Sequence, residues 1–310
     1  PGLLSFMNIE AAVQASGEEE EEAEDELTIP IDDKFFRVKT GQIQDILALV
    51  SLLGVLIKET GSGFLEYVRP TAEALHKILA CSDPVLNLAS SVRDAVYPCW
   101  ASLVQAVSRS IPARGAEAQA LAVELVSRFV DRVASDLAKA EDPEDIAPMA
   151  NGIAEVVSNA GPGCLQLSQI QGICDLAVSE IFKSLQREQS IKDGNQAAPD
   201  ANDGEGSEDS SVVGDALVRG EEDEEKECRL GLCAILGACM KASPEDFVLH
   251  SWPALKALME EWLGQQQHAG RPLGLNLACD LCEHLGERAV EIWPVFMEAI
   301  LESVCSVDAG

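Results

Sequence analysis

The sequence predicts an all-α fold assembled from repeated antiparallel helix pairs. Leucine and alanine are plentiful and aromatic residues make up only 5% of the chain, a composition that favours helix over sheet. Pro70, Pro253 and Pro294 each open a helical pattern. Proline suits the first turn of a helix, because the backbone N–H that it lacks would have no hydrogen-bond partner there. The last two prolines follow tryptophan and lie 41 residues apart, a period typical of HEAT and armadillo arrays. We therefore expect a HEAT-repeat α-solenoid, a right-handed superhelix of helix pairs without a β-sheet.

Composition divides the chain into helical and acidic parts. We expect residues 1–16 to hold the end of a preceding HEAT helix, 38–190 to form three helix pairs and 227–310 to form two more. Residues 17–37 are predicted to form an acidic loop and residues 191–226 an acidic insert. Both have too few bulky apolar side chains to form a core, so we predict two disordered acidic inserts. Because the chain begins with proline inside an apparent helix end, we interpret it as a fragment of a longer protein.

The individual helices are predicted from caps, breakers and apolar periodicity. Thr40 suits the N-cap of a helix that Gly61-Ser62-Gly63 ends, and apolar residues on two sides of this helix indicate packing between two neighbours. The Pro70 helix runs to about residue 81, and the following helix, over 82–108, is expected to kink at Pro98. The remaining helices are expected over 117–139, 146–160, 167–187 and 228–241, from Pro253, over 272–285 and from Pro294.

The formal net charge of −31 narrows the classes of partner. Eight acids fall in residues 18–26 and thirteen in residues 193–227, yet acids outnumber bases in the rest of the chain as well. The sequence lacks a basic footprint for nucleic acid or an acidic membrane, and basic proteins or peptides are the natural ligands. No run of about 18 uncharged apolar residues occurs, so we expect no transmembrane helix.

The sequence offers no constellation of catalytic residues. It has no Ser-His-Asp order, no phosphate-binding loop and no His-Glu-x-x-His motif, and its four histidines are scattered. We therefore expect a protein that is not an enzyme and that holds no cofactor.

The ten cysteines are scattered through apolar helical pattern, which favours free thiols in a reducing compartment. One cluster, Cys279-Asp280-Leu281-Cys282-Glu283-His284, resembles half of a zinc site. A second ligand pair is missing, and on a helix Cys279 and Cys282 share one face. We therefore predict that both thiols pack into the core and that no metal is bound.

Several segments carry a family resemblance by their order along the chain. Leu3-Leu4-Ser5-Phe6-Met7 precedes an acidic stretch, Val38-Lys39-Thr40 opens a repeat, and Gly63-Phe64-Leu65-Glu66-Tyr67 follows. Residues 149–163 precede Cys164-Leu165, and a second acidic stretch separates helix pairs. In this order the chain resembles the central-to-C-terminal part of the importin beta-3 branch, also called importin five, of the importin beta superfamily of karyopherins.

The resemblance implies a monomeric segment of a nuclear transport receptor that shuttles between cytoplasm and nucleus through the nuclear pore. Such receptors bind basic cargo proteins with nuclear-localisation signals, Ran in its GTP state and phenylalanine-glycine nucleoporins. In these stacks the second helix of each pair lines the concave face, so its outward side chains would meet the cargo. The residues expected there are Glu66, Glu73, Glu124, Asp131, Asp175, Glu180, Glu260, Glu261, Trp262, Glu298 and Glu302.

Two alternatives stay open at this level. The acids also fit ordinary solvated helix faces, and Trp252 and Trp262 also fit core packing rather than cation–π contact with a lysine. The whole chain also fits a HEAT-repeat scaffold, such as a phosphatase scaffolding subunit or an assembly factor, with no transport role. The acidic inserts favour transport, because scaffolds usually have short, tight loops.

Overall fold

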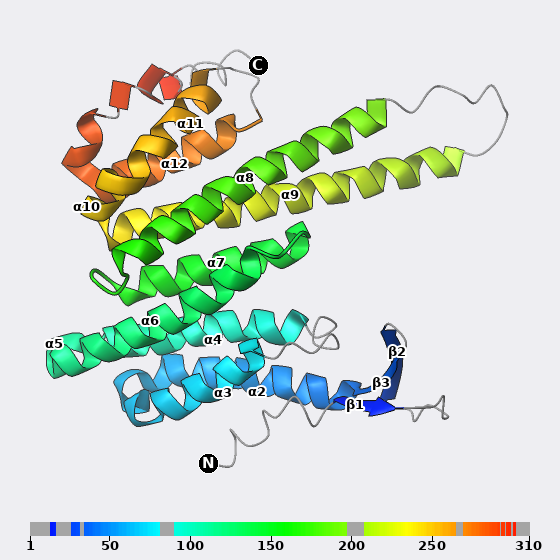
Figure 1. Ribbon diagram of the computed structural model, residues 1–310, viewed down its shortest axis with the longest axis vertical. Helices are drawn as coiled ribbons and strands as arrows, with labels where there is room; N and C mark the ends of the chain where they lie inside the picture. The colour runs from blue at the N-terminus through cyan, green and yellow to red at the C-terminus, as the bar shows by residue number, and fades with distance from the viewer. Residues whose placement is uncertain are drawn as a thin grey trace. The chain divides into compact units, whose positions relative to one another are not determined.

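The described part of the chain consists mainly of antiparallel helices, preceded by a small sheet (Figure 1). The chain forms two compact units, Pro1–Ser135 with Asn159–Cys164, and Asp136–Ser158 with Leu165–Gly310. The computed structural model describes residues 13–16, 26–31, 34–80, 90–196, 208–264, 269–291, 293–294, 296–298 and 300–301.

The first unit contains helices that, apart from a short one over residues 111–114 where a turn is expected, lie close to the predicted positions. They are α2 (Thr40–Thr60), α3 (Val68–Ala80), α4 (Ser90–Ser108), α5 (Ile111–Arg114) and most of α6 (Ala116–Leu137). Both α2 and α3 pack on α4, and a short 3-10 helix, η2 (Gly61–Tyr67), joins α2 to α3. Gly61 has a φ of 51°, a conformation open to glycine, so the chain leaves α2 at the predicted breaker.

The later part of the helix predicted over residues 82–108 is described as α4. Its first residue is Ser90, and the expected start at residue 82 falls within 81–89, outside the described residues. Pro98 lies inside α4, where the hydroxyl of Ser102 donates a 2.7 Å hydrogen bond to the Pro98 carbonyl. This hydroxyl bond reaches back one turn of the helix, whereas the ladder bond that Pro98 itself cannot make is the one to the carbonyl four residues before it.

Aromatic packing between α4 and α6 forms the core of the first unit. The ring of Trp100 lies 5.6 Å from that of Phe129, which also meets Tyr97 edge-on at 5.9 Å. The Trp100 indole N–H donates to the Leu125 carbonyl at 3.2 Å, which satisfies its polar atom inside the core. The apolar spacing of α6 predicts one buried face with Leu121, Leu125, Phe129, Val133 and Leu137; the last four are buried and Leu121 is half-buried.

Replacing Leu125 with alanine is expected to lower the free energy of unfolding by about 2–5 kcal/mol, because Leu125 is 2% exposed and its loss leaves a cavity. Leu121→Ala, one turn earlier and only half-buried, should cost clearly less. Denaturant unfolding of both variants measures the difference. Equal losses would contradict the assignment of the buried face of α6.

A three-stranded antiparallel sheet precedes α2, and it corrects the prediction that the chain has no sheet. The strands are β1 (Val13–Ser16), β2 (Glu26–Ile31) and β3 (Lys34–Lys39), in the spatial order β1-β3-β2. The register places Val13 opposite Val38 and Glu26 opposite Lys39.

The physical reason for the sheet is local composition. Strands β2 and β3 are rich in isoleucine, valine, threonine and phenylalanine, which suit a pleated surface. The acidic run and Pro30 obscured this signal. Residues 13–16 are thus a strand rather than the predicted end of a helix. Of the acidic loop predicted for residues 17–37, residues 26–31 and 34–37 are strand, and 17–25 and 32–33 lie outside the described residues.

The second unit holds the remaining helices. They are most of α7 (Pro143–Ala160), α8 (Leu167–Gln196), α9 (Glu208–Ala242), α10 (Pro244–Asp246), the π-helix η4 (Phe247–Ser251), α11 (Trp252–Gly264), α12 (Arg271–Leu285) and the 3-10 helix η5 (Gly286–Glu291). The long helices α8 and α9 run side by side, and α12 packs on both α9 and α11 (Figure 1).

The helices α8 and α9 extend into the acidic insert predicted for residues 191–226. Of that insert, 191–196 belong to α8 and 208–226 to α9, while residues 197–207 lie outside the described residues. Composition alone suggested that this acidic stretch could not join a core. The structure corrects this, because Glu225 is buried and pairs with Arg187 of the neighbouring helix at 2.5 Å.

One stretch has the length and composition of a membrane span. It covers Ile43–Ala80, with a mean hydropathy of 1.5 in its most apolar window, of which 22% is buried. The expectation of no such span rested on an uncharged run, and α2 carries Asp45, Lys58 and Glu59. A helix of a folded protein that has one uncovered apolar face also has this length and hydropathy. Leu52, Val55 and Leu56 give α2 such a face.

Candidate functional site

The predicted partner-binding acids of the first unit lie on α3, α6 and η2, and two of them are already paired. Glu124 of α6 lies 2.8 Å from Arg69 of α3, and Glu73 of α3 lies 2.7 Å from Arg128 of α6. The two pairs run in opposite directions between the same helices. Glu66, on η2, is exposed.

Pairing changes the chemistry that these acids offer. The hydrogen bond from Arg128, followed by the charge of Arg128, lowers the pKa of the Glu73 carboxyl. Asp131 is exposed on α6 and also has an interaction within the chain. This edge of α3 and α6 therefore presents alternating carboxylates and guanidinium groups rather than the purely acidic face that was predicted. The pairs were not visible in the sequence because their members lie 55 residues apart.

Among the predicted residues of the second unit, several are exposed. Asp175 lies on α8, Glu260 and Glu261 lie on α11, and Glu298 lies in the last described helical stretch. Glu260 is 3.7 Å from Lys256, one turn earlier. Glu302 lies outside the described residues.

Two predicted contact residues are buried, which corrects their assignment. Trp262 is 1% exposed and packs edge-on against Phe182, with ring centroids 6.5 Å apart, and Trp252 also belongs to the core. Glu180 is 1% exposed and one of its carboxylate oxygens accepts from Lys183 at 2.7 Å. Both side chains lie on helix faces that neighbouring helices cover, so neither reaches a partner on the surface.

A buried polar network joins α8 to α9. The Glu225 carboxylate accepts from both Arg187 and the Ser184 hydroxyl, the latter at 2.6 Å. Arg229 donates to the same hydroxyl at 3.2 Å and lies 2.7 Å from Glu188. Each buried charge thus has an opposite charge beside it, which buried charges require. The network fixes the register of the two long helices.

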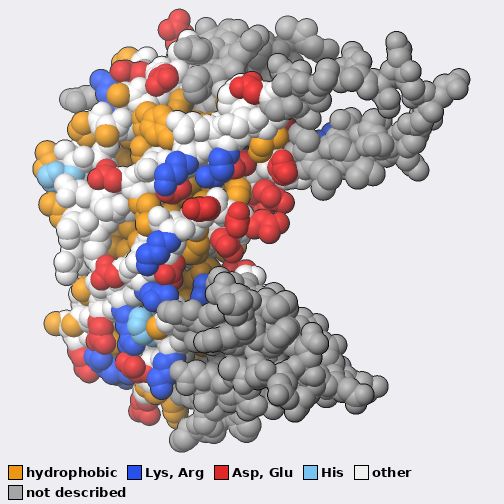
Figure 2. Space-filling model, turned by 45° about the vertical axis from the view of Figure 1, so that its right-hand side comes forward, with side chains coloured by type: hydrophobic (Ala, Val, Ile, Leu, Met, Phe, Trp, Pro, Cys, Tyr) orange, Lys and Arg blue, Asp and Glu red, His pale blue; other side chains and the backbone are white. Residues whose placement is uncertain are grey.

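Acidic side chains gather where the first turn of α7 meets α9, on the face visible in Figure 2. Loss of surrounding water, followed by the charge and hydrogen bond of Glu144, raises the pKa of Glu224. Glu221 and Glu225 add to this effect. Residues 221–225 fall in the tract that is predicted to be disordered, so they are not among the predicted site residues. The acid run of residues 221–227 was the available signal.

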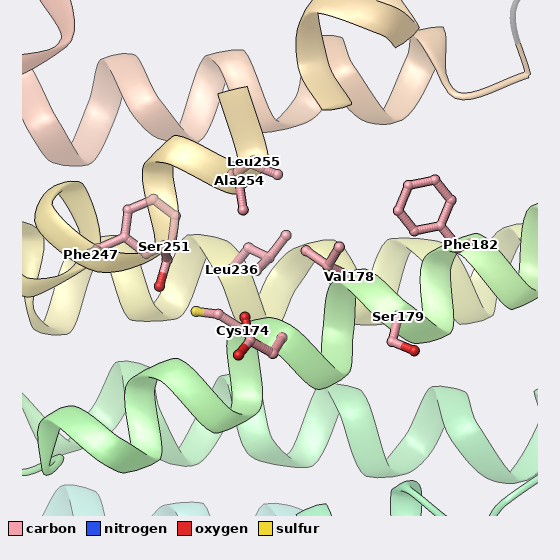
Figure 3. A pocket seen from close by; sticks show the side chains of 10 residues that line it. Cys174, Val178, Ser179, Phe182, Leu236, Phe247, Ser251, Ala254 and Leu255 are labelled. Carbon is pink, nitrogen blue, oxygen red and sulfur yellow. The ribbon is translucent and has the colours of Figure 1, made fainter. Parts of the chain in front are cut away.

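An apolar pocket of about 310 Å³ lies between α8, α9, η4 and α11 (Figure 3). Its walls are mainly Val178, Phe182, Leu236, Phe247 and Leu255. Phe182 is 38% exposed, a high value for a phenylalanine, so an apolar ring borders the opening.

The rim of this pocket supplies a few polar groups. Asp175, Ser179 and Ser251 line it together with the apolar walls, and Asp175 is exposed. Apolar walls with a small number of oriented polar groups are the usual form of a ligand-binding cleft. The pocket is not visible in the sequence, because its walls come from four elements between residues 174 and 255.

The thiols of α12 correct the packing prediction. Cys279 and Cys282 are exposed, because Leu277, Leu281 and Leu285 occupy the buried face of the helix. In the part of the chain that the structure describes, no three His, Cys, Asp or Glu side chains gather as metal ligands would.

Other cysteines are buried as predicted, and burial raises the pKa of the Cys99, Cys228 and Cys233 thiols to about 12 in each case. These three thiols therefore stay protonated near neutral pH and do not serve as nucleophiles.

No protein-family model and no curated protein matches the chain. Among solved structures, a triple mutant of Kap121p matches with a TM-score of 0.68, Kap121p with 0.67, and the karyopherin Kap121p bound to the SUMO protease Ulp1p with 0.66, each at 16% identity. Each match covers 97% of this chain and 26% of the solved chain, so the chain spans about a quarter of their length. The predicted fold is thereby confirmed as the helix-pair solenoid of karyopherins.

Proposed function

We propose that this chain is a segment of a nuclear transport receptor that binds basic cargo proteins. The supporting observation is the match of its helix order to a karyopherin over 97% of its length. The solved Kap121p structures include complexes with Ulp1p, with the extreme C-terminus of the phosphatase Cdc14p, and with Pho4p and Nup53p. The net charge of −31 supports a basic partner, because opposite charge steers association.

Binding to Ran-GTP and passage between cytoplasm and nucleus are the further parts of the proposal. A pull-down with Ran loaded with GTP or with GDP tests them directly. Preference for the GTP form supports a transport receptor. Absence of binding in both states, together with capture of a phosphatase subunit, would favour a scaffold without a transport role.

The exposed acids of α6 are proposed as cargo contacts, and the double reversal Glu124→Lys with Asp131→Lys tests them. Binding of a basic nuclear-localisation peptide should weaken about tenfold, and salt should weaken it further, because screening reduces attraction between exposed charges. Fluorescence anisotropy at two salt concentrations measures both effects.

A matched control separates recognition from structure. The swap Arg69→Glu with Glu124→Arg preserves the ion pair between α3 and α6 but moves the carboxylate to α3. If the swap binds normally, the position of Glu124 is unimportant and only net charge matters. If neither variant differs from the parent, the α6 acids are not cargo contacts.

The apolar pocket of Figure 3 is proposed to take the phenylalanine rings of nucleoporin repeats. Ala254 is exposed at this pocket, so Ala254→Asp should weaken binding of a Phe-Gly repeat peptide at least about tenfold, because a carboxylate must then lose water. Ala257→Asp is the control, since Ala257 is an exposed alanine of α11 that does not line the pocket. Equal affinities of the two variants would exclude the pocket as the binding site.

A further inference from the structure

The helix α12 carries two exposed thiols that none of the proposed binding surfaces uses. Its buried face is formed by Leu277, Leu281 and Leu285, so Cys279 and Cys282 are turned outward. In the described part of the chain the other free cysteines are buried: Cys99, Cys164, Cys174, Cys228, Cys233 and Cys239. An exposed thiol can meet a dissolved oxidant, whereas a buried thiol is protected from it. Among these cysteines, the two on α12 are therefore the accessible pair.

One of the two thiols opens onto a cleft. Cys279 lines a cavity of about 510 Å³ between α9 and α12, together with Lys241, Asp280, Glu283 and His284. Hydrogen peroxide is small and uncharged, so it can enter a cleft of mixed charge. A bulky anionic disulfide such as oxidised glutathione would meet both carboxyl groups and be repelled by them. The cleft therefore suits a small neutral oxidant.

The second thiol lies within reach of the first. Residues three apart on a helix are neighbours on one face, with Cβ atoms about 5–6 Å apart. Burial, followed by the charge of Cys279, raises the pKa of the Cys282 thiol, so Cys282 is protonated near neutral pH. Cys279, at the cleft, is thus the thiol that meets the oxidant first, and Cys282 is the neighbour that can attack the oxidised sulfur.

A bridge between the two sulfurs needs a small change at the end of α12. A disulfide has Cβ atoms about 3.5–4.5 Å apart, so the two side chains must approach each other by about 1–2 Å. The helix ends at Leu285, within one turn of Cys282, and Gly286, with a φ of 54°, begins η5. The ends of helices open more easily than their centres, so the last turn of α12 can supply this movement.

We propose that Cys279 and Cys282 form a reversible dithiol–disulfide site on α12 that hydrogen peroxide oxidises. First the Cys279 thiolate attacks one peroxide oxygen and the O–O bond breaks, which leaves a sulfenic acid and a hydroxide that becomes water with the proton of the thiol. Cys282 then loses its proton and attacks the Cys279 sulfur. The S–S bond forms, the S–O bond breaks, and the second hydroxide leaves as water with that proton. The two thiols thus lose two electrons and two protons, and one peroxide becomes two waters.

The bridge is expected to be reversible. Exposed and strained disulfides are more easily reduced than buried, relaxed ones, and a bridge within one helix is both. In a reducing compartment it would persist only while the oxidant is present.

Peptide mapping by mass spectrometry of the folded chain after treatment with hydrogen peroxide tests the proposal. The peptide that contains both thiols should lose two hydrogens and regain them with reduced glutathione. Cys282→Ser should instead keep a sulfenic acid at Cys279, which dimedone labels. Cys233 lines the same cleft but is 3% exposed, so it should be oxidised at least about tenfold more slowly. A pair that stays reduced, two unlinked sulfenic acids, or equally fast oxidation of Cys233 would overturn the proposal.

A displaced thiol provides the matched control. Cys282→Ser with Glu287→Cys keeps two exposed thiols, because Glu287 is exposed on η5. At a rise of about 1.5 Å per residue, position 287 lies about 12 Å from Cys279, beyond the reach of a disulfide. This variant should form less than about a tenth of the bridge that the parent forms. Equal linkage in both proteins would contradict a site that depends on the spacing of the two cysteines.

Discussion

Replacing Glu225 with alanine is expected to destabilise the second unit by about 3–5 kcal/mol, because the change leaves the Arg187 guanidinium without its carboxylate and the buried Ser184 hydroxyl without its carboxylate acceptor. The Glu225 side chain is 3% exposed, so water does not replace the lost partner. Chemical unfolding followed by circular dichroism measures the loss.

Two further variants distinguish the network from a general effect of charge. Glu221→Ala removes an exposed acid one turn earlier on α9 and should change stability by less than about 0.5 kcal/mol. Glu225→Ala combined with Arg187→Ala should recover part of the loss, because it removes the guanidinium that lost its partner. A loss that is the same for Glu221→Ala and Glu225→Ala would contradict the buried network.

Replacing Phe129 with alanine is expected to destabilise the first unit by about 3–5 kcal/mol, since Phe129 is fully buried between Trp100 and Tyr97. Tyr67→Ala is the matched control, because Tyr67 is an aromatic residue of the same unit that is 56% exposed. Its replacement should cost less than about 1 kcal/mol. Thermal and denaturant unfolding of the two variants provide the comparison, and a Phe129→Ala loss below that of Tyr67→Ala would show that the α4–α6 core is wrongly placed.

The two proposed binding surfaces belong to different units of the chain. The reversal of Glu124 and Asp131 and the variant at Ala254 address two different surfaces, in the first and second units respectively. Loss of basic-peptide binding without loss of Phe-Gly binding would assign separate partners to them.

Helix positions were predictable because they depend on signals within a few residues. Pro70 and Pro253 fall in the first turns of α3 and α11, Gly61 ends α2, and the apolar spacing of α6 identifies its buried face. Caps, breakers and apolar periodicity act within a few residues, so the sequence alone is enough to predict where a helix begins and ends.

The sheet and the long helices were harder to predict because local signals conflicted. Strands β2 and β3 combine β-favouring side chains with a neighbouring acidic run, and the run decided the prediction. In α9 the acids of residues 221–227 indicated disorder, although Glu225 lies on the side that meets Arg187, 38 residues away. A charged residue is stable in a core only when an opposite charge lies beside it. The sequence does not show which residue of a neighbouring helix supplies that charge.

By itself the sequence determined the helical class, the repeated pairs and the acidic character of the chain, since all three follow from composition and short-range spacing. The tertiary structure decided which side of each helix is covered. It buried Glu180 and Trp262, exposed Cys279 and Cys282, paired Glu124 with Arg69, and assembled the apolar pocket from four separate elements. The physical reason is that the burial and pairing of a side chain depend on the neighbouring helix. The sequence of one helix shows only the periodicity of its own apolar residues.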